Sequence, residues 1–160
     1  MRNWGEKIIV IEPYVELTRM IERMHRRLLD VVRVQLNEMN ISDITPVQAL
    51  LLANIEGEDV LFRDLVERGY YLGSNASYNI KKLVDGGYLK QERSSFDKRS
   101  VRIRLAEKGQ ALCQKLLEAN ITASKVFNEK AESGVNLTTA CQTLRQLERM
   151  WADYIHYGHL

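Results

Sequence analysis

A short stretch with a two-residue period constrains the fold of this chain more than any other feature of its sequence. Within residues 100–105, apolar and basic side chains alternate strictly from Val101 to Leu105, in the order Val101, Arg102, Ile103, Arg104 and Leu105. Such alternation indicates a strand with one face in a core and one charged face. Residues 88–93 form a second strand in this interpretation, and residues 94–99 join the two. Elsewhere the apolar residues recur three and four positions apart, so we predict a mainly α-helical chain with one small β-hairpin.

Three short helices are predicted before the hairpin. Residues 45–48 supply an N-cap threonine, a proline at the first helical position and a capping-box glutamine, so a helix should begin there and end near Gly57. The next helix is expected over residues 60–68. A further helix, with Ser74 as its N-cap, should cover residues 74–85.

Longer amphipathic helices flank this region. One covers about residues 14–39, with Pro13 just inside its start, another begins at Ala106, and the last carries a stripe from Leu137 to Ile155. In a single chain these stripes can fold on each other, but their length favours a two-fold dimer. We therefore predict a winged helix-turn-helix unit flanked by long N- and C-terminal dimerisation helices, with boundaries at residues 1–44, 45–105 and 106–160.

Three short helices followed by a hairpin is the order of a winged helix-turn-helix unit. In such a unit the third helix enters the major groove of DNA, and the hairpin lies along the backbone toward the minor groove. The charge distribution agrees with this role, because the whole chain has a net charge of +2 whereas residues 81–104 contain eight Lys or Arg and three Asp or Glu. A local basic patch indicates an anionic partner, and double-stranded DNA is the first candidate.

The predicted DNA-binding residues lie on the last short helix and on the hairpin. At 100° per residue, the face of the helix opposite its apolar residues is basic, aromatic and amide-bearing. From this helix we assign to the site Ser74, Asn75, Ser77, Tyr78, Lys81 and Lys82. From the hairpin, the bases that can neutralise phosphates are Lys90, Arg93, Lys98, Arg99, Arg102 and Arg104. The alternative is that this helix face and the hairpin loop are merely solvated.

Three motifs in this part of the chain resemble the MarR family of bacterial transcription regulators. They are Leu83-Val84-Asp85-Gly86-Gly87-Tyr88-Leu89, Asp97-Lys98-Arg99 and Leu105-Ala106-Glu107-Lys108-Gly109. The resemblance extends from about Tyr14 to Ile155. It implies that Arg99 is a wing-tip residue that inserts into the minor groove, and that Asp97 orients guanidinium groups nearby. Ala106 departs from the family pattern, which has Thr there, and its missing hydroxyl costs the following helix about 1 kcal/mol at most.

The resemblance also implies a dimer and a small effector, which in relatives is often aromatic or phenolic. Residues suited to a pocket between the dimer helices and the DNA-binding unit are Met20, Met24, His25, Thr45 and Phe62. For each of these residues, ordinary core packing is the alternative.

Several classes of site are not expected from this sequence. Cys113 and Cys141 are far apart on apolar stripes, so we expect two small core residues rather than a disulfide, a zinc site or reactive thiolates. The three histidines have no metal-ligand spacing, and no nucleophile–base cluster or phosphate-binding loop is found, so neither enzymatic activity nor a cofactor or metal is expected. No apolar run approaches the roughly 20 residues that span a bilayer, and we expect a cytoplasmic protein with no membrane partner.

The sequence thus predicts a sequence-specific regulator of transcription that binds a pseudo-palindromic operator as a homodimer. A ligand-responsive repressor is the leading interpretation. Two alternatives remain open: a thiol- or redox-sensing regulator of the same fold, and a winged-helix module that binds proteins and not DNA. The basic segment at residues 81–104 argues against the second alternative.

Overall fold

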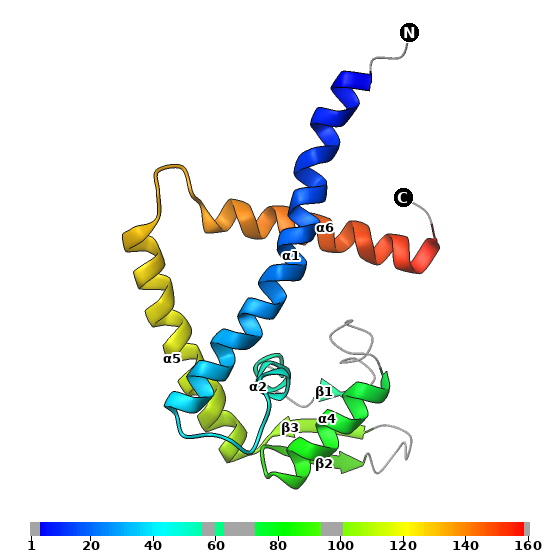
Figure 1. The fold of residues 1–160 in the computed structure, drawn as a ribbon. Coiled ribbons are helices and arrows are strands. Elements are labelled where there is room, and N and C mark those ends of the chain that lie inside the picture. The colour runs from blue at the N-terminus through cyan, green and yellow to red at the C-terminus, as the bar shows by residue number, and fades with distance from the viewer. Residues whose placement is uncertain (1–3, 56–59, 63–72, 94–100, 159–160) are drawn as a thin grey trace. The chain divides into compact units, whose positions relative to one another are not determined.

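The structure, a computed structural model, describes residues 4–55, 60–62, 73–93 and 101–158 of the chain. Figure 1 labels the helices and strands of these residues. Their bounds are α1 Trp4–Glu38, α2 Pro46–Ala53, β1 Val60–Leu61, α4 Gly73–Asp85, β2 Leu89–Arg93, β3 Val101–Leu105, α5 Glu107–Lys130 and α6 Leu137–Tyr157. The chain divides into two compact units, Met1–Asn120 and Ile121–Leu160.

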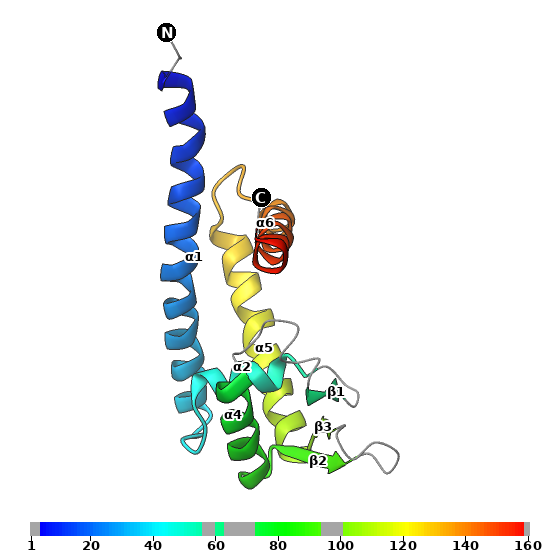
Figure 2. The same cartoon turned by 90° about the vertical axis from the view of Figure 1, so that its right-hand side faces the viewer.

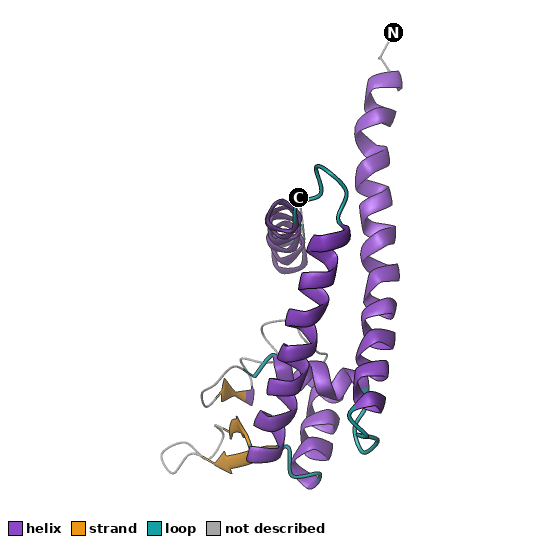
Figure 3. Ribbon diagram, turned by 90° about the vertical axis from the view of Figure 1, so that its left-hand side faces the viewer, coloured by secondary structure: helices purple, strands orange, loops and turns teal. Residues whose placement is uncertain are grey.

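The strands form one small antiparallel sheet in the order β1-β3-β2. The predicted hairpin is present, with Lys90 opposite Arg104 and Gln91 opposite Ile103. Figure 3 shows that the strands gather in one place within an otherwise helical chain. A mainly α-helical fold with a winged-helix sheet is therefore confirmed.

The third strand of this sheet corrects the sequence-based interpretation. Val60 and Leu61 were expected to begin a helix, but they pair with Ile103 and Arg102 of β3. A hairpin edge carries unpaired backbone groups, and a short extended segment beside β3 satisfies them. Most of the predicted helix, residues 63–68, lies outside the described residues.

Helix α1 also differs from the prediction, because it begins at Trp4 and has Pro13 in its interior. A proline removes one backbone donor from the helix, but here the helix continues on both sides of it. Helix α2 ends at Ala53 and not near Gly57, and its C-cap is Asn54. Helix α4 begins at Gly73, one residue before the predicted cap. The predicted start and capping box of α2 are confirmed by hydrogen bonds between Thr45 and Gln48 in both directions.

The core of the first unit lies where α1, α2, α4, the sheet and the start of α5 meet. Helices α2 and α4 lie between α1 and the strands (Figure 2), and α2 packs against both helices while α4 packs against β2. Side chains with 2% or less of their surface exposed include Ala49, Leu51, Leu52, Ala76, Leu83, Tyr88, Leu89, Ile103 and Leu112. This core joins the helix-turn-helix to the hairpin, so the two are positioned by the same contacts.

The second unit has little core of its own. Helix α6 begins at the N-cap Asn136, whose side chain accepts a hydrogen bond from the backbone N–H of Thr139, and ends at Gly158 with a φ of 74°. Leu147 is buried, whereas Leu144 and Tyr154 on the predicted stripe are exposed. Cys141 is exposed too, so the expectation that it is a core residue is wrong. Its stripe is apolar in sequence, but the described residues of this unit leave position 141 uncovered.

Candidate nucleic-acid interface

Helix α4 has the two faces that its sequence predicts. Ala76, Ile80 and Leu83 are buried, with exposed fractions of 1%, 4% and 0%. The residues that the structure leaves exposed on this helix include five of the predicted contacts, Asn75, Ser77, Tyr78, Lys81 and Lys82. Packing of the apolar face against the core therefore turns the basic and aromatic face outward.

Tyr78 and Lys82 form a pair on that exposed face. The Lys82 Nζ atom lies 5.8 Å from the centre of the Tyr78 ring, within the range of a cation–π contact. Tyr78 is 62% exposed, so the ring and the ammonium group are both available to a partner. The contact restricts the conformations of both side chains. Less conformational entropy is therefore lost when they bind a partner.

The outer face of the hairpin carries a second group of charges. Lys90, Arg102 and Arg104 are exposed, whereas Ile103 between the two arginines is fully buried. The alternation predicted for this strand is therefore confirmed. Glu92 of β2 forms an ion pair with Arg104 across the sheet, a partner that was not assigned to the site from the sequence.

The helix and the hairpin lie next to each other, with a cavity of about 470 Å³ between them. The cavity is lined by residues of α4, of the hairpin, and by the residue that follows β1. These residues are Phe62, Ser77, Ile80, Lys81, Gln91, Val101 and Ile103. Two of the predicted contacts, Ser77 and Lys81, thus face the side of α4 where the wing stands. Ser74 and Arg93 belong to α4 and β2, while the predicted wing-tip residues Asp97, Lys98 and Arg99 lie outside the described residues.

A cluster of three polar side chains holds the hairpin to the helices, and sequence reasoning missed it. Asp43, in the loop before α2, accepts a hydrogen bond of 2.8 Å from the Tyr88 hydroxyl and one of 2.7 Å from Lys108 Nζ. Lys108 also donates to the carbonyl oxygen of Gly86 at 3.1 Å, and its Nζ lies 4.0 Å from the centre of the Tyr88 ring. The cluster connects three segments that are far apart in sequence.

The same contacts displace the pKa values of the cluster. The hydrogen bond from Lys108, and then the one from Tyr88, lowers the pKa of Asp43 below its usual value of 3.8. Burial, and then the hydrogen bond to Asp43, raises the pKa of Tyr88. The hydrogen bond to Asp43 raises the pKa of Lys108. Asp43 is therefore ionised and Lys108 protonated at neutral pH.

Gly109 gives a steric reason for the motif at the start of α5. A Cβ atom at this position would lie 2.2 Å from the carbonyl oxygen of Tyr88. The same oxygen accepts a hydrogen bond of 2.9 Å from the N–H of Ala106. The first turn of α5 thus packs directly on the backbone between α4 and β2, where only glycine fits.

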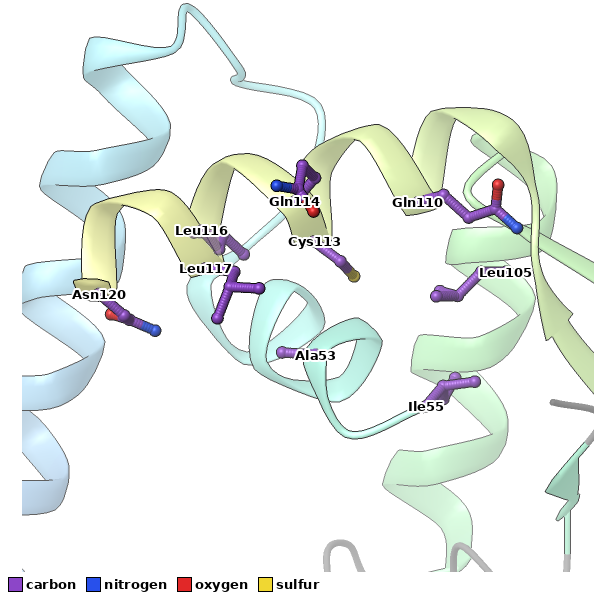
Figure 4. A pocket seen from close by; sticks show the side chains of 9 residues that line it. All are labelled: Ala53, Ile55, Leu105, Gln110, Cys113, Gln114, Leu116, Leu117 and Asn120. Atoms are coloured by element: carbon purple, nitrogen blue, oxygen red, sulfur yellow. The ribbon is translucent and has the colours of Figure 1, made fainter. Parts of the chain in front are cut away.

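The candidate effector residues lie on different elements of the described part of the chain. Met20, Met24 and His25 are exposed on α1, Thr45 is the exposed N-cap of α2, and Phe62 lines the cavity beside α4. A different cavity of about 500 Å³ is shown in Figure 4. It is lined by Ala53, Ile55, Leu105, Gln110, Cys113, Gln114, Leu116, Leu117 and Asn120.

Cys113 points from α5 toward α2 in this second cavity (Figure 4). It is half-buried and packs against the core, as predicted. Burial raises the pKa of its thiol, which lowers the fraction of the reactive thiolate at neutral pH. Among the residues that the structure describes, no group of three or more potential metal ligands occurs and no helix is long and apolar enough to cross a membrane.

A helix with a buried apolar face and an exposed basic face, joined through one core to an antiparallel wing, defines the class of winged-helix transcription regulators. Comparison with known proteins narrows the class. Residues 42–100 match the profile of the MarR family. The chain is also 41% identical over 145 residues to the exopolysaccharide II synthesis transcriptional activator ExpG of Rhizobium meliloti, covering 91% of this chain and 75% of that protein. The chain belongs to the MarR family, and it is a transcriptional regulator and not an enzyme.

Solved structures agree on the fold. The transcriptional regulator SlyA has a TM-score of 0.75 at 19% identity, over 88% of this chain and 97% of that one. A putative MarR family regulator from Listeria monocytogenes, solved in complex with a 26mer DNA, has a TM-score of 0.73 at 22% identity, over 89% of this chain and 95% of that one.

Proposed function

We propose that this regulator binds double-stranded DNA as a homodimer through α4 and the hairpin. The observation that carries the proposal is the joint arrangement of two basic surfaces, since the exposed face of α4 and the outer face of the β2–β3 hairpin stand on one core. The solved complex of the Listeria relative with DNA supports this use of the fold. In this proposal residues 45–105 form the DNA-binding unit, and residues 1–44 and 106–160 serve dimerisation.

The two surfaces take different roles in the proposed complex. Tyr78, Lys81 and Lys82, together with Asn75, face the major groove, where their donors read base edges. Lys90, Arg102 and Arg104 face phosphates, which they neutralise without reading sequence. Arg93 and Lys98 neutralise phosphates as well. Arg99 inserts into the minor groove, with Asp97 orienting guanidinium groups nearby, as the family resemblance implies.

Exposed apolar side chains on the long helices support the homodimer. On α1 they include Met24, Leu28, Val31 and Val34, which are 47–57% exposed. On α6 Tyr154 and Ile155 are 51% and 83% exposed. Apolar surface of this extent in a single chain marks an interaction site. A second copy of the chain covers it in our proposal, and the two recognition helices then meet successive major grooves of a pseudo-palindromic operator.

Regulation by a small ligand is part of the proposal. An aromatic or phenolic effector, whose candidate contacts are Met20, Met24, His25, Thr45 and Phe62, binds one state of the protein more tightly than the other. It thereby shifts the balance between the state that binds DNA and the state that does not. Repression is the direction that we infer for a ligand-released regulator. Activation is the second candidate, because the relative that is 41% identical is named a transcriptional activator. A reporter gene behind the bound operator, with and without the regulator, distinguishes the two.

The DNA-binding proposal is tested by selecting bound genomic fragments and titrating one selected duplex at two salt concentrations. The affinity must fall steeply as the salt concentration rises. Lys81→Ala, Arg102→Ala and Arg99→Ala must each weaken binding. Replacing a residue that contacts a phosphate should also reduce the slope of log affinity against log salt concentration by about one. Lys125→Ala, an exposed lysine of α5 far along the chain from the site, is the matched control and must bind as the wild type. Absence of binding at low salt, or equal losses in the control, would overturn the proposal.

A further inference from the structure

The N-terminus of α2 contains the buried polar side chain of Gln48, which is only 6% exposed. Its Oε1 atom accepts a hydrogen bond of 2.9 Å from the backbone N–H of Thr45. A backbone N–H can only donate, so the capping box determines which end of the Gln48 amide is oxygen. The Nε2 amino group of Gln48 must therefore be at the other end.

That amino group meets helix α4. The Nε2 atom of Gln48 donates a hydrogen bond of 3.2 Å to Oδ1 of Asn79. Because an amino group cannot accept, Asn79 must turn its own oxygen toward Gln48. The backbone N–H of Thr45 thus fixes the orientation of the Gln48 amide, and Gln48 fixes the orientation of the Asn79 amide on α4, the helix that carries predicted DNA contacts.

The Nδ2 amino group of Asn79 consequently points away from Gln48. It makes no hydrogen bond to another described residue. Asn79 is half-buried, and within the described part of the chain no buried side-chain nitrogen or oxygen lacks a partner. The Nδ2 atom is therefore not buried, and it is a donor without an acceptor among the residues that the structure describes.

Asn79 lies beside the DNA-binding face of α4 and was not assigned to it from the sequence. At 100° per residue it is about 40° from Asn75 and about 60° from Lys82 around the helix axis. Its other neighbours on the helix, Ile80 and Leu83, are buried. Asn79 thus stands at the edge of the exposed face that is nearest to α2.

We propose that Asn79 is a further DNA-contacting residue and that Gln48 is its positioning residue, which makes Asn79 a donor and not an acceptor toward DNA. The inference rests on the proposed DNA-binding function. A donor at this place matches an acceptor on the DNA: O6 or N7 of guanine, O4 of thymine, N7 of adenine, or a phosphate oxygen. It does not match the amino groups of adenine N6 or cytosine N4.

The first test replaces the donor. Asn79→Asp keeps an oxygen for Gln48 and presents a second oxygen to the DNA, whereas Asn79→Ala removes both. Asn79→Ala should weaken operator binding about tenfold, and Asn79→Asp should weaken it further because a carboxylate repels acceptors and phosphates. Asn128→Ala, an exposed asparagine on α5, is the control and should leave affinity unchanged.

The second test reverses the orientation of the Asn79 amide without a substitution at Asn79. In Gln48→Glu, one carboxylate oxygen still accepts from the N–H of Thr45, but the other cannot donate to Asn79. The Asn79 amide should then rotate, donate its Nδ2 to position 48 and present Oδ1 to the DNA. Thermal unfolding followed by circular dichroism checks that this variant folds, and Asn79→Asp carries the test if it does not.

The readout is the affinity for a set of duplexes with each operator position substituted in turn. If the acceptor is on a base, Gln48→Glu should reverse the preference at one position, from a base that accepts to adenine or cytosine, whose amino groups donate. If the acceptor is a phosphate, the loss should be equal for every duplex. The inference is overturned if Asn79→Ala and Asn79→Asp both bind like the wild type. A wild-type protein that binds no duplex would instead contradict the proposed function itself.

Discussion

The two units of this chain use similar sequence patterns but bury them differently. In the first unit, the apolar residues of α2, α4 and the hairpin form a core with Leu51, Leu83 and Ile103 fully buried. In the second, Leu147 is buried, and it is the only buried residue among the described positions 121–158. The other apolar residues of α6 are half-buried or exposed. The first unit is stabilised by contacts within one chain. The second presents an exposed apolar surface, which the second copy of the chain covers in the proposed homodimer.

The largest expected effect comes from adding one methyl group to the packed unit. Gly109→Ala should destabilise the protein by more than about 4 kcal/mol, because the new Cβ would lie 2.2 Å from a backbone carbonyl. Gly134→Ala, between α5 and α6, is the matched change: its Cβ would meet nothing within 4 Å, and only the φ of 93° opposes it, at a cost of about 1 kcal/mol. Urea unfolding of both variants measures the difference. Equal losses of unfolding free energy in the two variants would contradict the difference in packing between the two positions.

A second pair of variants removes the same side chain from each unit. Leu83→Ala, at a fully buried position, should cost about 3 kcal/mol in the free energy of unfolding. Leu144→Ala, where the side chain is 44% exposed, should have little effect on the fold of one chain but raise the dissociation constant of the dimer about tenfold. Sedimentation equilibrium measures the second effect. A monomeric wild type would contradict the proposed homodimer.

The polar cluster in the packed unit predicts a smaller, pH-dependent effect. Tyr88→Phe keeps the ring and removes the hydroxyl that donates to Asp43, which should cost about 1 kcal/mol at neutral pH. The folded state lowers the pKa of Asp43 below 3.8, so its stabilising contribution is present above that value and is lost as the pH falls through the folded-state pKa. The difference between wild type and variant should therefore shrink in acid. A difference that is constant down to the acid transition would argue against an ionised Asp43 as the acceptor.

The smallest effect concerns the start of α5, which lies within the packed unit. Ala106 directly precedes the helix and has no side-chain oxygen to accept from the first turn. Ala106→Ser should add such an acceptor and stabilise the protein by about 0.5 kcal/mol. Thermal unfolding at fixed protein concentration checks the gain. Because the position is only 8% exposed, a loss of stability would mean that packing at this site outweighs the cap.

Much of the proposed DNA-binding surface follows from local periodicity. The two faces of α4 and the alternation along β3 were predicted, because neighbours three, four or two positions apart decide which side of an element is apolar. The capping box at Thr45 was predicted for the same reason. Pro13 and Cys141 show the limit of such reasoning, since a helix can continue through a proline and an apolar stripe need not be covered.

The sequence by itself determined the class of fold, the two faces of the helix that we propose to read DNA, and the charge of the described strands of the wing. Only the tertiary structure decided which distant residues meet: Asp43 with Lys108, 65 positions apart, Gln48 with Asn79, 31 apart, and β1 with β3. These pairs depend on how the chain folds back on itself, and no local pattern specifies a partner that far away. The closest approach, Gly109 against Tyr88, has the same origin, because a missing side chain is required only where another backbone arrives.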